Sequence, residues 1–139
     1  MKTKKKLNLE LLWILMPLAM AFVFISSAHA YRSITNRENA VTIDVRPEQL
    51  AKDQPVKFMV RMSTHSVALD EDMAAVSELK DDTGKTYQPV NWEGSPPGGH
   101  HRSGTLEFPK LEGNPKKVTL SIRNVSNVPE RIFQWEIEP

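Results

Sequence analysis

The sequence predicts an all-β domain built as a sandwich of two antiparallel sheets, and two observations lead to this fold class. Apolar and polar residues alternate along several short segments, as in Val41, Ile43 and Val45 with polar residues between them. Such alternation is typical of strands that have one face on a core and the other in water. Turn-forming residues separate these segments at short intervals, for example at 81–84 (DDTG), which is typical of sandwiches made of many short strands.

Seven segments of the chain are predicted to be strands, and their number and spacing favour an antiparallel sandwich of the immunoglobulin-like kind. They comprise residues 41–46, 55–63, 75–80, 85–91, 104–109, 117–123 and 131–137. The third strand is expected because the hairpin signal at 81–84 needs a leading arm. A short helical turn is the alternative there, since Leu69, Met73 and Val76 also fit a helical stripe. The acidic residues 70–72 would suit the N-terminus of such a turn.

The first 30 residues follow the order of an export signal. Lysines cluster at 2–6, an uncharged run of fifteen residues follows at 11–25, and Ala28 and Ala30 lie where a signal peptidase cuts. The run is shorter than the ~20 residues of a spanning helix, but the uncharged stretch reaches that length if it extends to residue 30. Two outcomes therefore stay open: a cleaved signal peptide, with a secreted or periplasmic product, or a retained anchor that contacts the membrane through residues 11–30. In both, the lysines stay in the cytoplasm and the C-terminal part is exported.

The exported part is expected to be one small domain, at 41–139, after a polar linker at 31–40. Four of the 18 Lys and Arg and one of the 17 Asp and Glu lie within residues 1–30, which leaves a formal net charge of −2 for the rest. Such a near-neutral domain without a basic cluster argues against nucleic acid as a partner. The chain has no cysteine, so disulfides, thiolate nucleophiles and iron–sulfur clusters are excluded.

Loops at one end of the sandwich are the expected working surface. Because every second connection between antiparallel strands emerges at the same end, we expect loops 64–74, 92–103 and 124–130 to lie together. The predicted first strand also starts at this end, so a retained anchor would hold these loops near the membrane.

The residue types in these loops suggest a binding surface made by Trp92, His100, His101 and Arg102. Binding surfaces are common on loops carried by a rigid sandwich, and Trp and Arg are favoured in binding hot spots. We therefore expect a non-enzymatic interaction module of the cell envelope, without a cofactor, whose partner is another envelope or surface protein. The geometry of a retained anchor favours a membrane-embedded partner. The alternative for Trp92 is that it covers the open end of the core.

A zinc or copper site is the alternative function of the same end of the domain. Its ligands would be His65, one of His100 and His101, and Asp70 or Asp72, because imidazole and carboxylate suit these ions. Adjacent residues on an extended chain point to opposite faces, so only one of the two neighbouring histidines would bind. The spacing matches no metal motif, and no catalytic motif such as G-x-S-x-G occurs. We therefore expect no enzymatic activity.

Overall fold

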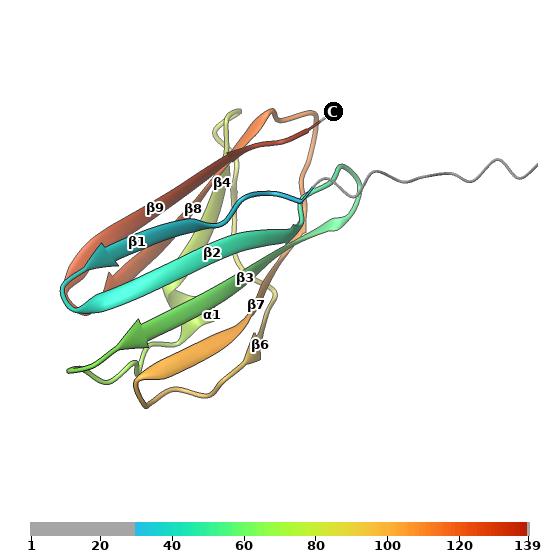
Figure 1. The fold of residues 1–139 in the computed structure, drawn as a ribbon. Coiled ribbons are helices and arrows are strands. Elements are labelled where there is room, and N and C mark those ends of the chain that lie inside the picture. Colours follow the sequence, from blue (N-terminus) through green and yellow to red (C-terminus); the bar gives the residue numbers. More distant parts are fainter. Residues whose placement is uncertain (1–29, 139) are drawn as a thin grey trace, which may run out of the picture.

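The computed structural model describes residues 30–138, which form two antiparallel β-sheets packed face to face (Figure 1). The strands are β1 (Ile34–Glu38), β2 (Val41–Gln49), β3 (Pro55–Thr64), β4 (Ser77–Asp81), β5 (Thr86–Tyr87), β6 (Asn91–Gly94), β7 (His101–Lys110), β8 (Lys117–Val125) and β9 (Val128–Glu136). One helix, α1 (Met73–Val76), accompanies them in this part of the chain. No helix between residues 30 and 138 has the length and apolar character needed to cross a bilayer. The predicted export segment, apart from Ala30, lies outside the described residues.

The strand order divides the chain between the two layers. The first sheet has five strands in the order β1-β2-β3-β7-β6, and the second has four in the order β5-β4-β8-β9. Every pairing is antiparallel, and the chain passes between the sheets after β3, β5 and β7. The predicted all-β class with two antiparallel sheets is therefore confirmed.

The core lies between the sheets and is built by the alternation that the sequence displays. Val41, Ile43 and Val45 of β2 are fully buried. At the centre, the ring of Phe58 on β3 lies 6.0 Å from that of Phe108 on β7 and 5.2 Å from that of Trp135 on β9, measured between centroids. Because β9 belongs to the other sheet, these rings join the two layers. Burying each such side chain stabilises the fold by about 1.5–3 kcal/mol.

The number of strands differs from the predicted seven, because the described residues form nine. The segment predicted as one strand at 85–91 is divided into β5 and the start of β6, which belong to different sheets. Pro89 lies in the connection between them and has no N–H to donate to a ladder, so the chain leaves one sheet there and joins the other. The other additional strand is β1, within the segment expected to be a linker.

Strand β1 reverses the direction from which the chain enters the domain. It pairs with β2 from Ile34 opposite Val45 to Glu38 opposite Val41. The turn between them, Asn39 and Ala40, has φ of 44° and 64°, a conformation that matches the type I′ hairpin turn. The described chain therefore begins at the end of the sandwich where Leu50 lies. The predicted first strand does start beside loop 64–74, since Val41 lies opposite Thr64, but the inference that the chain also enters the domain there is wrong.

The region 70–80 contains both structures between which the sequence left a choice. Asp72 caps the single turn of α1, since its Oδ1 accepts hydrogen bonds from the backbone N–H groups of Ala74 at 3.0 Å and Ala75 at 3.3 Å. Strand β4 follows immediately at Ser77. Capping by aspartate stabilises a helix start by about 1 kcal/mol, and the fully buried Met73 packs the turn against the core.

Candidate functional site

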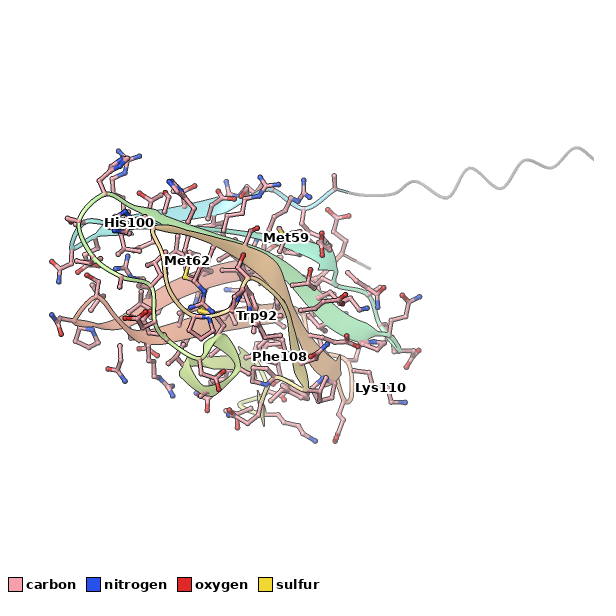
Figure 2. All side chains as sticks on the ribbon, turned by 90° about the horizontal axis from the view of Figure 1, so that it is seen from below. Met59, Met62, Trp92, His100, Phe108 and Lys110 are labelled. Carbon is pink, nitrogen blue, oxygen red and sulfur yellow. The ribbon has the colours of Figure 1, made fainter. Side chains whose placement is uncertain are left out.

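The loops before α1 and before β7 lie side by side at one end of the sandwich. Backbone hydrogen bonds join them: Thr64 N–H donates to the His100 carbonyl at 3.0 Å, Leu69 N–H to the Gly99 carbonyl at 3.1 Å, and Gly98 N–H to the Leu69 carbonyl at 2.8 Å. Figure 2 shows His100 at this end and Lys110 at the other. We call residues 65–72 and 95–100 the loop pole. The expectation that these two loops share one end is confirmed.

Two hairpin turns, one from each sheet, lie against each other at the same end. The Asn39 side-chain amide donates to the Ser126 carbonyl at 3.2 Å, and the Ser126 hydroxyl donates to the Asn39 carbonyl at 2.8 Å. The backbone N–H of Ser126 also donates to the Glu71 carboxylate at 3.4 Å. The third predicted loop, 124–130, is therefore in contact with the loop pole as well.

Arg102 is buried beneath the loop pole, with 3% of its surface exposed. Its Nη1 donates to the carbonyls of Leu69 at 2.9 Å and Glu71 at 2.7 Å, and its Nη2 to that of Ser95 at 3.4 Å. It therefore holds the two loops together from below. It was expected to contact a partner, but its guanidinium is enclosed by the protein. Arg102 is enclosed because side chains alternate between the two faces of β7, so that His101 points outward and Arg102 points inward.

Trp92 lies half-buried on β6 and packs against the core. Its indole N–H donates to the Ser95 carbonyl at 3.1 Å. A Cβ at position 104 would lie 2.7 Å from the Trp92 ring, so glycine is required there. These contacts favour the alternative interpretation of Trp92, in which it covers the end of the core.

The histidines of the loop pole and its margin, His65, His100 and His101, are exposed. Their side chains form no hydrogen bond or ion pair with the rest of residues 30–138. His101 faces Ser63 across the β3–β7 ladder, and His100 lies beside Thr64. The three exposed imidazoles are therefore available to contact a ligand.

The ligand set predicted for zinc or copper is not gathered in the structure. Asp72 uses its carboxylate to cap α1, while Asp70 is exposed on the loop pole. Among residues 30–138, no group of three or more His, Asp or Glu side chains is positioned to hold a metal ion.

A second buried arginine, Arg131, joins the two sheets beside the loop pole. Its side chain is 1% exposed and donates to the carbonyls of Glu38 at 2.9 Å, Val41 at 3.2 Å and Val125 at 3.4 Å, and to the Asn36 side chain. Burial lowers the pKa of Arg131 from its ordinary value, and the negative charges of Glu38 and Glu71 oppose this change. Arg131 was not among the residues predicted to be functional, although its spacing from Phe133 and Trp135 places it on the inward face of β9.

Comparisons of the chain with protein-family models, with curated proteins and with solved structures found no match. The geometry alone therefore indicates what this end of the domain can do. It presents exposed polar groups on two loops that Arg102 fastens to the sandwich.

Proposed function

We propose that this chain is an exported, non-enzymatic binding module with an immunoglobulin-like fold, and that the loop pole is its working surface. The strand orders β2-β3-β7-β6 and β5-β4-β8-β9 support the fold assignment. They correspond to the orders A-B-E-D and C′-C-F-G of immunoglobulin-type sandwiches, with β1 as an addition before strand A. Domains of this kind present their binding loops at one end.

The observation that carries this proposal is the attachment of the loop pole to the sandwich by Arg102. Three charge-assisted hydrogen bonds run from this buried guanidinium to carbonyls in both loops. Loops fixed in this way lose little conformational entropy when they bind a partner, which favours affinity. The exposed side chains of His65 and His100 would be the first contacts.

The partner we propose is an envelope or surface protein that binds from the side away from the membrane. Tyr31 lies at the end opposite the loop pole, where its hydroxyl donates to the Leu50 carbonyl at 3.0 Å. The ten residues of β3 extend over about 30 Å between the two ends. If the anchor is retained, the loop pole would be held at about that distance from the membrane, so the reason to prefer a membrane-embedded partner is lost.

Photo-crosslinking in the native cells tests this proposal. A photoreactive amino acid would replace His65 or His100 at the loop pole, with Lys52 near the opposite end as the matched control, because all three side chains are exposed. We expect one discrete adduct from His65 and His100 and none from Lys52. An equal adduct from Lys52, or none from the loop pole, would contradict the proposal.

A further inference from the structure

The outer face of the five-stranded sheet has two adjoining hollows beside the loop pole. One, of about 370 Å³, is lined by Arg61, His101 and Ser103 among others. The next, of about 320 Å³, is lined by Arg37 and His65 among others. Both hollows also include Thr42 and Ser63, so the two hydroxyls form the ridge between them.

The register of the sheet explains why these side chains gather. Thr42 lies opposite Ser63, which lies opposite His101 on the next strand. In the neighbouring row that faces the same way, Asp44 lies opposite Arg61, which lies opposite Ser103. Because side chains two residues apart on a strand share a face, the two rows form one continuous polar surface across β2, β3 and β7.

The two arginines on this surface, Arg37 and Arg61, form no ion pair within residues 30–138. Arg61 makes no hydrogen bond or ion pair with any residue from 30 to 138. Arg37 donates only its Nε, to the Thr42 hydroxyl at 3.1 Å, which leaves both of its terminal nitrogens available. By contrast, the single carboxylate among these residues, Asp44, accepts hydrogen bonds from Ser33 at 2.6 Å and Thr35 at 2.8 Å.

We propose that this surface binds a phosphate group over Thr42 and Ser63, between Arg37 and Arg61. Guanidinium groups bind phosphate through two parallel hydrogen bonds, and hydroxyls supply further donors. Donors that approach from three strands suit the tetrahedral phosphate better than a planar carboxylate. The phosphate could be free, part of a phosphodiester polymer or a lipid headgroup. This site lies on the sheet face, so it goes beyond the binding role proposed for the loop pole.

Calorimetric titration of the full chain in a non-ionic detergent, at fixed ionic strength, tests the proposal. The probes are inorganic phosphate, poly(glycerol phosphate) and short-chain dihexanoyl phosphatidylglycerol, with acetate as the carboxylate control. We expect saturable binding of at least one phosphate probe, and the tightest of the three identifies the source. Saturable binding of none, or equally tight binding of acetate, would overturn the proposal.

Three variants connect the binding to the named residues. Arg61→Gln should weaken the binding about tenfold, because one charge-assisted bidentate contact is lost. Asp44→Asn should tighten it about threefold by removing a nearby negative charge. Arg46→Gln is the matched control, since Arg46 is an exposed arginine on the same sheet face, one row further from Thr42, and should change the affinity less than twofold. Equal losses of affinity in the Arg61 and Arg46 variants would show that the probe is held by non-specific charge attraction, which would contradict the proposed site.

Discussion

The guanidinium carbon of Arg102 lies 5.9 Å from the centroid of the Trp92 ring. This contact joins β7 to the neighbouring edge strand β6, directly beneath the loop pole. A buried cation over a tryptophan ring contributes about 1–2 kcal/mol, in addition to the hydrogen bonds that the same guanidinium donates to Leu69 and Glu71. A single side chain therefore couples the edge of the sheet to the order of the loops.

Arg102→Met should lower the free energy of unfolding by about 2–4 kcal/mol, because buried carbonyls lose charged donors. Hydrogen exchange at the Leu69 and Gly98 amides should accelerate as well, since the loop pole loses its attachment. Arg61→Met is the control, because Arg61 is exposed, and it should change stability by about 0.5 kcal/mol or less. Urea denaturation measures both variants. Equal effects would show that Arg102 has no special structural role.

Arg131→Lys should be destabilising although it keeps the positive charge. A lysine ammonium is a point charge without the planar fork of arginine, so it cannot reach the carbonyls of both Glu38 and Val125. We expect a loss of about 2–3 kcal/mol, with the fastest hydrogen exchange in the β1–β2 turn. If thermal unfolding of this variant matched the wild type, Arg131 would not join the sheets.

Ala40→Gly should stabilise the protein by up to about 1 kcal/mol. Ala40 has a φ of 64°, in the left-handed region that costs a residue with a Cβ about 1–2 kcal/mol, and glycine removes this cost at a smaller entropic loss. Ala51→Gly is the matched control, because Ala51 is exposed and is not among the residues with positive φ. Ala51→Gly should lower the free energy of unfolding slightly. Chemical denaturation of the two variants should therefore give changes of opposite sign.

Asp81 should make stability depend on pH in the acid range. Its burial would raise the pKa, but hydrogen bonds from Thr83, Tyr87 and Lys85 outweigh this and hold the pKa below its ordinary value. A lowered pKa in the folded state stabilises the protein above the unfolded value of about 3.9, and this contribution is lost as the pH falls through the folded pKa. Asp81→Asn should therefore be less stable than the wild type at pH 7, by about 1–3 kcal/mol.

The test of Asp81 is a series of denaturation curves between pH 7 and pH 2 for both proteins. The difference in unfolding free energy should be constant down to about pH 4 and should shrink below it. A difference that stayed constant over the whole range would mean that the folded pKa of Asp81 is not lowered.

Zn(II) and Cu(II) should not raise the thermal stability of the full chain, because the predicted ligands are not gathered. If His65, His100 or His101 bound either ion in the native state, stability would rise by about 2.7 kcal/mol at one hundred times the dissociation constant. A shift of that size, abolished by changing all three histidines to alanine, would restore the metal function as the better proposal.

The fold class followed from the sequence wherever alternation was strong, as in Val41, Ile43 and Val45. Strand β1 was not predicted because Ile34 is its only apolar residue, which gives the segment the composition of a linker. The strand is held mainly by its backbone pairing to β2, which the residue pattern does not reveal. Missing it also placed the chain entry at the wrong end. A local pattern cannot indicate a reversal that depends on a hairpin turn without glycine.

The convergence of the loops was predictable from antiparallel topology, but the roles of individual residues were not. Trp92 and Arg102 were chosen by residue type, which does not indicate the face of the strand on which each lies. The alternation of β7 would have placed Arg102 beside Leu106 and Phe108 on the inward face. A buried arginine is recognised only when its acceptors, here carbonyls distant in sequence, are known.

The most direct test of the arrangement is a pair of spin-label distances, which the absence of native cysteine makes possible. Labels on His65→Cys and His100→Cys should lie less than about 20 Å apart, because the two loops adjoin. Labels on Lys52→Cys and His100→Cys should lie at least about 30 Å apart, the length of a ten-residue strand. Similar distances for the two pairs would contradict the location of the loop pole at the end away from the chain entry. A broad distance distribution between positions 65 and 100 would contradict the fixed attachment of the loops.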